Sequence, residues 1–292
     1  MKYSSGAAFR QALQTRILTL HNDSGIPITR IRKVIAFERF LARLLFLFPG
    51  SWVLKGGMMM ELQFQHRART TKDIDLLVRN NKIDLHPALI NTGKFDLRDW
   101  FGFEVGKPFK ENHDQINTVR FNVTSLLDSR TFESFHVDIN HEDILVQDPV
   151  LIKGSRYLDF AGIEPIRIPC YPLAQQIAEK LHALTAIHQS GEVSRVKDLV
   201  DILVIAGNRQ LPLEELRRAI QSTFEHRKKH GLPVSSPRIA AMYSRNFSSL
   251  AKQVGLKQKS LNEANIALEE FLLPVISGSM PKTWNPKRWK WE

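Results

Sequence analysis

The chain has 292 residues, of which 43% are hydrophobic and 24% charged, as in a soluble globular protein that buries one large core or two moderate ones. No apolar run reaches the roughly 18 residues that a membrane-spanning helix requires, and the N-terminus lacks the apolar segment of a signal peptide. The single cysteine, Cys170, excludes an internal disulfide. These features predict a cytoplasmic protein with no membrane partner.

Lysine and arginine number 41 against 30 aspartates and glutamates, which gives a net charge of +11 and a pI near 9.8. An excess of this size favours a polyanionic partner, with nucleic acid as the first candidate. The alternative is a charge that serves solubility alone, because charge identifies neither a sequence nor a chemistry.

Helical apolar spacing opens the chain, over residues 5–20 and 28–48, and the second helix is expected to stop at Pro49-Gly50. The pattern then changes from helical to mixed. The elements expected next are a short strand over Trp52–Leu54, a helix from Gly57 to about residue 65, and a buried strand over Ile74–Val78.

Residues 95–145 have a strand-like pattern. Two segments, 118–127 and 133–140, alternate or run apolar on either side of a polar turn, which predicts an antiparallel hairpin. An extended segment follows and ends at Pro172. Helices are then expected over 173–187, 195–206, 213–229, about 237–253 and about 259–275, with a loop at 188–194.

The predicted fold class is therefore α+β, a mixed sheet core flanked by helices and followed by a mostly helical domain. We expect residues 1–170 to form the core with its N-terminal helices, and residues 171–292 to form the helical domain with a basic tail. That tail is expected to be extended, and its cations are interleaved with three tryptophans, which suits stacking on bases. Packing of these tryptophans against the protein body is the favoured alternative.

Lys55-Gly56-Gly57 joins the first expected strand to a helix. Glycine lets a backbone come close to phosphate oxygens, and a helix N-terminus offers free N–H groups and a favourable dipole. The segment is not a Walker A loop, because the spaced glycines and Gly-Lys-Ser/Thr ending are missing from the sequence. A plain turn is the alternative.

Asp73 and Asp75 lie in the next expected strand, where residues i and i+2 point to one face. Two nearby carboxylates repel unless a cation lies between them, and Mg²⁺ binds through one or two carboxylates plus substrate phosphates. Two solvated aspartates at a strand end are the alternative.

Asp138 is a third carboxylate, flanked by two β-branched residues in the apolar segment 133–140. A charged residue in such a segment needs a partner. If this strand lies beside the one that holds Asp73 and Asp75, three carboxylates converge. Three carboxylates can hold the two metal ions of nucleotidyl transfer, so we predict a metal site at these residues.

The glycine pair, short helix and Asp-x-Asp resemble the first motif of nucleotidyltransferases with a polymerase-β-like core. Within that superfamily they are similar to the AbiEii/AbiGii toxins of type IV toxin–antitoxin systems, to which the mycobacterial MenT toxins are related. The motif reads Lys55-Gly56-Gly57 and Arg69-Thr70-Thr71-Lys72-Asp73-Ile74-Asp75, with Thr71 at the usual serine or threonine position. The spacer between Gly57 and Asp73 is longer than in the wider superfamily.

Two later motifs extend the resemblance to roughly residues 50–205. The family's helical lysine is matched by Lys180 within Glu179–Leu184, and its Arg-x-Lys-Asp-Leu-x-Asp run by Arg195–Asp201. The resemblance implies that Lys180 binds the β- or γ-phosphate of a nucleotide as a point charge, and that Asp198 positions Lys180 or the nucleotide. The alternatives are a surface lysine paired with an acid, and acids favoured by a helix dipole.

The resemblance implies a nucleotidyltransferase-like fold and a Mg²⁺-dependent toxin of abortive infection, a form of phage defence. It would transfer NMP from an NTP to RNA, with the tRNA 3′ end as the leading acceptor, and would have a cognate antitoxin. The implied catalytic residues are Asp73, Asp75, Asp138, Lys180 and Asp198, and the implied nucleotide-binding residues are Lys55, Gly56, Gly57, Thr71 and Lys180.

Two other functions stay open at this point. The chain could modify a protein in place of RNA, or bind nucleic acid without catalysis on a degenerate transferase fold. The histidines show no zinc pattern, and we expect His182 at the surface of its helix.

Overall fold

The computed structural model describes residues 1–80, 82–109, 118–186, 195–278 and 282–292, which form two compact units. The first unit comprises Met1–Gln63, Thr70–Asp143 and Pro149–Cys170. The second comprises Phe64–Arg69, Ile144–Asp148 and Tyr171–Glu292. The chain therefore passes between the units several times.

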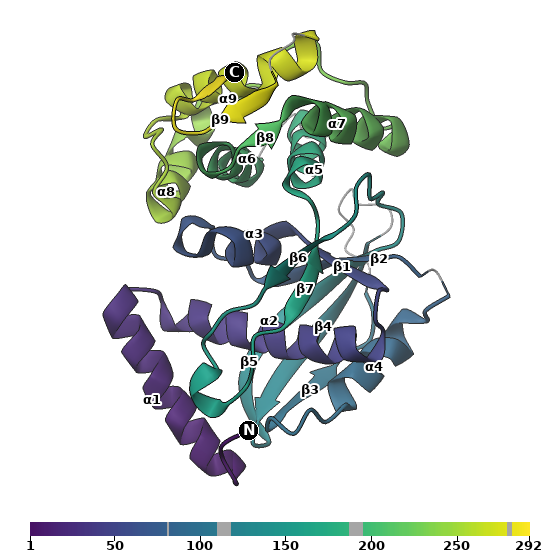
Figure 1. The fold of residues 1–292 in the computed structure, drawn as a ribbon, viewed down its shortest axis with the longest axis vertical. Coiled ribbons are helices and arrows are strands. Elements are labelled where there is room, and N and C mark those ends of the chain that lie inside the picture. The colour runs from purple at the N-terminus through teal and green to yellow at the C-terminus, as the bar shows by residue number, and fades with distance from the viewer. Residues whose placement is uncertain (81, 110–117, 187–194, 279–281) are drawn as a thin grey trace. The chain divides into compact units, whose positions relative to one another are not determined.

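A seven-stranded sheet is the core of the first unit (Figure 1). Its strands, in spatial order, are β3 (Phe101–Val105), β4 (Thr118–Leu127), β5 (Arg130–Asn140), β2 (Asp73–Val78), β1 (Trp52–Lys55), β7 (Arg167–Cys170) and β6 (Val150–Lys153). Strands β2 and β5 pair in parallel, as do β1 and β7, whereas the other neighbours are antiparallel. This mixed sheet confirms the predicted α+β class.

The long hairpin of β4 and β5 turns at Asp128 and Ser129, whose φ angles are 53° and 58°. Two consecutive residues with positive φ are typical of a type I′ turn, whose twist matches that of the flanking strands. The hairpin predicted from the sequence is confirmed.

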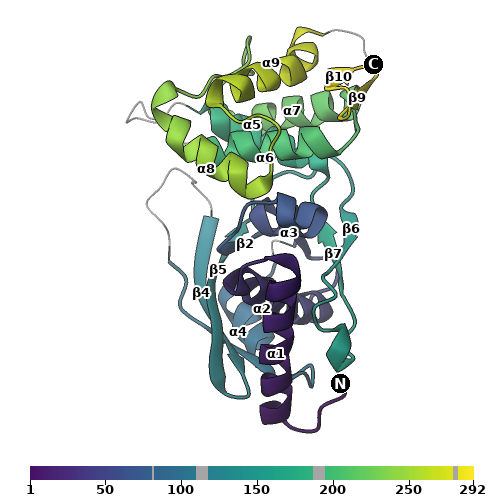
Figure 2. The same cartoon turned by 90° about the vertical axis from the view of Figure 1, so that its left-hand side faces the viewer.

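The helices of the first part of the chain are α1 (Gly6–Ser24), α2 (Ile28–Leu47), α3 (Gly56–Phe64) and α4 (Leu85–Lys94), with short 3₁₀ turns at Gln65–Arg67 and Asp159–Ala161. Helices α1, α2 and α4 lie on one side of the hairpin (Figure 2). Phe37 and Phe40 of α2 place their rings 4.9 and 5.9 Å from that of Phe135 on β5. Strand residues alternate, so the side chains next to Phe135 face the other side of the sheet.

Glu38 of α2 is buried, with 5% of its surface exposed, and its carboxylate accepts hydrogen bonds from the Ser155 backbone N–H (2.6 Å) and hydroxyl (2.8 Å). Burial raises the pKa of Glu38 from 4.5 to about 7, against the lowering effect of the bonds from Ser155. Between pH 4.5 and about 7, Glu38 is therefore protonated in the folded protein and ionised in the unfolded chain.

We expect Glu38→Gln to flatten the pH dependence of stability. In the wild type, this residue's favourable contribution to the free energy of unfolding is complete below pH 4.5 and is lost as pH rises to 7. Glutamine keeps an oxygen for the Ser155 N–H but does not ionise. Denaturant unfolding at pH 5 and pH 8 should show the variant gaining about 3 kcal/mol relative to wild type at the higher pH. Parallel pH profiles for the two proteins would contradict the assignment.

The second unit is mostly helical and ends in a small antiparallel sheet (Figure 1). Its helices are α5 (Leu173–Thr185), α6 (Val196–Asn208), α7 (Leu213–Arg227), α8 (Ser244–Val254) and α9 (Leu261–Ser277), with a 3₁₀ turn at Ala241–Tyr243; its strands are β8 (Leu211–Pro212), β9 (Thr283–Asn285) and β10 (Lys290–Trp291). The prediction of an α-helix from about 237 is wrong, because α8 begins at Ser244, after Pro237 and an irregular segment. The loop predicted at 188–194 lies outside the described residues.

The C-terminal tail folds onto its own unit. Trp284 is fully buried, and its indole N–H donates to the carbonyl of Ala206 at 2.6 Å. The indole N–H of Trp291 donates to the carbonyl of Phe271 at 2.8 Å. The alternative favoured in the sequence, tryptophans packed against the body, is confirmed, and these two rings are held by the protein rather than available for stacking on bases. Within the described residues, no helix has the length and apolar character needed to cross a membrane.

Candidate active site

Charged side chains form one row across four strands of the first unit. Lys55 of β1 stands opposite Asp75 of β2. Asp75 is in register with Asp138 of β5, whose other neighbour is Arg120 of β4. Cross-strand partners point to the same face of a sheet, so two carboxylates lie side by side between two cations. We call Lys55, Asp75, Asp138 and Arg120 the charged row.

Asp73 lies on the same face, two residues before Asp75, and is in register with His136 of β5. The His136 Nδ1 is 2.9 Å from Asp73 Oδ1, and 41% and 32% of the two side chains are exposed. The sequence pattern predicted no role for His136. It becomes a site residue because β5 pairs with β2, and the face it shares with Asp138 is the one opposite Phe135.

The glycine pair brings the backbone against the two motif side chains Asp75 and Thr71. Gly56 has φ +65°, and a Cβ placed there would come closer than 3.0 Å to the Asp75 carboxylate. A Cβ on Gly57 would lie 2.5 Å from Thr71 Oγ1. Glycine at position 56 therefore satisfies both a left-handed conformation and a close approach, which a plain turn would not require.

Asp138 has both carboxylate oxygens bound by Arg120. The distances are 2.6 Å from Nε to Oδ1 and 2.6 Å from a terminal nitrogen to Oδ2, and 19% and 11% of the two side chains are exposed. At the other end of the charged row, Lys55 forms an ion pair with Asp143. Arg120 and Asp143 were missed in the sequence, because their roles depend on strand pairing and loop position rather than on a motif.

The donor set fits Mg²⁺ at Asp73 and Asp75. Their carboxylates share one face, and the glycine turn leaves Asp75 directly beside backbone with no side chain between them. Mg²⁺ commonly takes one or two carboxylates and completes its shell with water and phosphate oxygens. Among the described residues, however, no three His, Cys, Asp or Glu side chains form a group that could hold a metal. Asp138 lies next to the pair but is engaged by Arg120.

Lys180 and Asp198 belong to the second unit, where they form a buried network with Arg69 and Asp201. Lys180 Nζ lies 2.8 Å from Asp198 Oδ1 and 3.1 Å from Asp201 Oδ2. Arg69 Nε lies 3.0 Å from Asp201 Oδ1. Burial alone would lower the pKa of Lys180, but the charges of Asp198 and Asp201 outweigh it and the pKa is raised. The predicted contact of Lys180 with a nucleotide stays a prediction, and we call these four residues the Lys180 cluster.

The expectation of a surface position for His182 is wrong. The residue is 2% exposed, and its ring lies 4.9 Å from that of Phe224 and 4.4 Å from that of His230. An imidazole on an amphipathic helix has both apolar and polar character, so the sequence pattern alone does not determine which way it faces.

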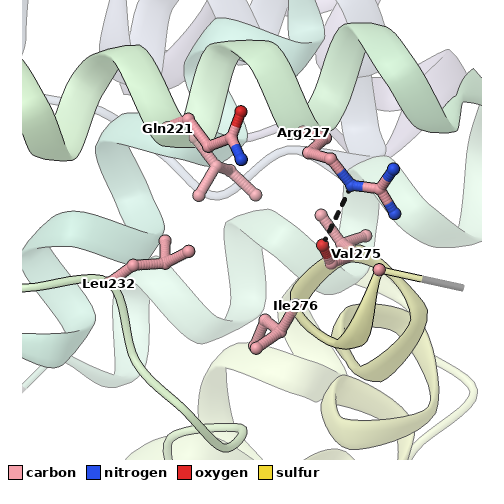
Figure 3. A pocket seen from close by; sticks show the side chains of 7 residues that line it. Arg217, Gln221, Leu232, Val275 and Ile276 are labelled. Atoms are coloured by element: carbon pink, nitrogen blue, oxygen red, sulfur yellow. Dashed lines mark hydrogen bonds between the residues drawn. The ribbon is translucent and has the colours of Figure 1, made fainter.

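A cavity of about 160 Å³ in the second unit offers a different kind of surface (Figure 3). It is lined by Arg217, Ile220, Gln221, Leu232, Val275, Ile276 and Gly278. Arg217 Nε donates a hydrogen bond to the Val275 carbonyl at 3.3 Å, so the guanidinium is held against the end of α9 (Figure 3). No carboxylate occurs among these lining residues, so the cavity lacks the groups that hold a metal for phosphoryl chemistry.

Comparison with known proteins gives a family and a fold. The family described as "Nucleotidyl transferase AbiEii toxin, Type IV TA system" matches residues 39–283, which is more than half of the chain. Curated protein sequences give no match. The nucleotidyltransferase toxin MenT4 of Mycobacterium tuberculosis H37Rv is a structural match with a TM-score of 0.59 at 15% identity, covering 94% of this chain and 92% of that one.

Two Helicobacter pylori structures are more distant, each at 15% identity and 84% coverage of this chain. JHP933 has a TM-score of 0.46 and 93% coverage of its own chain, and a putative nucleotidyltransferase has 0.43 and 96%. The structural similarity to MenT4 shows the fold, and the family match shows the enzyme class. The chain therefore belongs to the AbiEii family of nucleotidyl transferase toxins of type IV toxin–antitoxin systems.

Proposed function

We propose that the chain transfers a nucleoside monophosphate from an NTP to RNA in a Mg²⁺-dependent reaction, with the tRNA 3′ end as acceptor. The observation that carries this proposal is the packing of the glycine turn against Asp75, on the sheet face that also bears Asp73 and Asp138. A nucleotide with its magnesium needs both features, a close backbone for phosphate oxygens and carboxylates for the metal.

The residues of the first unit divide the work of the transfer. Asp73 and Asp75 would hold Mg²⁺, which when bound offsets the negative charge of the triphosphate. The turn at Gly56 and Gly57 binds phosphate oxygens through backbone N–H groups. Asp138 helps to take the proton of the acceptor hydroxyl, whose oxygen attacks the α-phosphorus as pyrophosphate leaves.

An RNA acceptor is supported by the net charge of +11 and by a basic pocket in the first unit. The pocket has a volume of about 150 Å³ and is lined by Arg10, Leu13, Gln14, Arg32, Leu127, Arg130, Thr131 and Phe132. The Arg32 guanidinium lies 4.3 Å from the centre of the Phe132 ring. Arg10 also pairs with Asp128 at 3.5 Å, and Arg32 donates to the Phe132 carbonyl. Guanidinium groups around one pocket suit phosphate oxygens of a polynucleotide backbone. The sequence resemblance implies the tRNA 3′ end as the acceptor. It also implies a cognate antitoxin as a protein partner.

The test is to incubate the purified protein with each α-³²P-labelled NTP, Mg²⁺ and total RNA, and then to separate RNA from protein. We expect label on RNA at the size of tRNA, sensitive to removal of the 3′-terminal nucleotides and abolished by EDTA. Competition by unlabelled tRNA, but not by double-stranded DNA, should lower the incorporation.

Two results would contradict the proposal in different ways. Label on protein and none on RNA would favour a toxin that modifies a protein, with the basic pocket serving that target or an acidic antitoxin. Binding of RNA without transfer of label from any NTP would favour a nucleic-acid-binding protein on a transferase fold. Transfer to an RNA other than tRNA would support the proposed transferase activity and contradict the proposed tRNA acceptor.

A further inference from the structure

Arg120 belongs to the charged row but has no part in the catalytic scheme. It binds both oxygens of Asp138 in a bidentate pair with two 2.6 Å contacts. A guanidinium in this geometry satisfies a carboxylate more completely than a lysine can. While the pair is intact, both oxygens that Asp138 would offer to a cation are engaged by Arg120.

The position of Arg120 in the sheet leaves its side chain as the part that can move. Its backbone pairs with Asp138 of β5 on one side and exchanges two hydrogen bonds with Phe109, at 2.9 and 3.1 Å, on the other. Only rotation of the side chain can then separate the guanidinium from Asp138 without breaking the sheet. With 19% of the Arg120 side chain exposed, the guanidinium is partly open to solvent.

The charges of the row favour an exchange in which Arg120 releases Asp138 and binds a phosphate when a cation is present. Asp138 lies directly beside Asp75, and two neighbouring carboxylates repel each other unless a positive charge lies close to both. A divalent cation at Asp73 and Asp75 supplies that charge and is the largest one in the site when present. A phosphate group, like the Asp138 carboxylate, has two oxygens that can accept paired hydrogen bonds from the guanidinium.

We propose that Arg120 is a counter-ion that holds Asp138 until the metal and nucleotide arrive. Asp138 then ligates the cation, and Arg120 transfers its hydrogen bonds to a phosphate oxygen of the nucleotide. This inference rests on the proposed function, since it concerns the same site. It makes two predictions of opposite sign for one substitution, which a purely structural ion pair would not produce.

The first measurement is the affinity for Mn²⁺ in the absence of nucleotide. The electron paramagnetic resonance signal of the free ion reports how much Mn²⁺ is unbound. Arg120→Gln should bind Mn²⁺ about tenfold more tightly than wild type, because a competing cation is removed beside two carboxylates. Arg167→Gln removes the same charge from β7 of the same sheet and should leave the affinity unchanged. Circular dichroism establishes that each variant is folded, and Arg120→Lys, with one contact in place of two, should be intermediate.

A double-mutant cycle separates ligation by Asp138 from a general effect of charge. Asp138→Asn should weaken Mn²⁺ binding at least about fivefold more in the Arg120→Gln background than in wild type, because only there are both oxygens available. Equal losses in the two backgrounds would overturn the proposal. Asp75→Asn is the reference for the site itself: if it leaves Mn²⁺ binding unchanged, the proposed metal site fails, independently of Arg120.

The second measurement is binding of an α,β-methylene NTP in the presence of Mn²⁺. Here Arg120→Gln should bind several-fold more weakly than wild type, although it binds the metal alone more tightly, because the phosphate has lost a bidentate partner. Unchanged or tighter binding of the analogue would overturn the phosphate contact. Both measurements use the full chain and neither depends on turnover.

Discussion

Asp75→Asn is expected to lower nucleotidyl transfer by on the order of 10³-fold at saturating NTP, while the protein stays folded. Asparagine preserves the shape of the side chain against Gly56 and removes its charge. The charged row would then have one carboxylate, Asp138, and that carboxylate is bound to Arg120. Several kcal/mol of charge stabilisation at the triphosphate would be lost with the metal.

The measurement is the initial rate of label transfer from NTP to RNA over a range of Mg²⁺ concentrations. Asp23→Asn is the matched control, because it makes the same chemical change at an exposed position on α1 of the same unit. Its rate should equal that of wild type, and thermal unfolding should place both variants close to the wild-type protein. An Asp75→Asn protein that keeps more than a tenth of the wild-type rate at low Mg²⁺ would exclude Asp75 as a metal ligand.

The sequence predicted the elements of the site better than their partners. Strand β2 and the glycine turn follow from local patterns, since alternation places Asp73 and Asp75 on one face and glycine marks the turn. Their closeness to Asp138 was conditional on strand order. Strands β2 and β5 are separated by more than 50 residues and pair in parallel, and no local signal specifies such a pairing.

The features that were missed are consequences of that pairing or of weak local signals. His136 reaches Asp73, and Arg120 binds Asp138, because β5 lies between β4 and β2. Helix α4 was not predicted, since its sequence LHPALINTGK is short and its proline and glycine are also typical of turns, although a helix tolerates proline in its first turn. Tertiary packing decides both cases.

Lys180→Met is expected to destabilise the second unit by about 3 kcal/mol, because it leaves two buried carboxylates with less positive charge around them. Asp198 and Asp201 expose 8% and 2% of their side chains. Arg69 still binds Asp201 in the variant, whereas Asp198 loses its 2.8 Å contact with Lys180 and keeps the longer one, 3.6 Å, to Arg195. Methionine retains the apolar stem of the lysine, so the loss reports the charge rather than a cavity.

Hydrogen exchange of the α5 and α6 amides measures this loss locally, which avoids assuming that a chain of two units unfolds in one step. Lys197→Met is the control, because Lys197 is exposed on the first turn of α6 and should exchange as wild type does. Adding Asp198→Asn to Lys180→Met should recover part of the lost protection, since Asp198, which loses its 2.8 Å contact with Lys180, then no longer carries a charge. If Lys180→Met retains wild-type protection and the transfer reaction is nevertheless lost, the lysine is needed for the reaction rather than for stability. Wild-type protection together with wild-type transfer would assign the Lys180 cluster neither role.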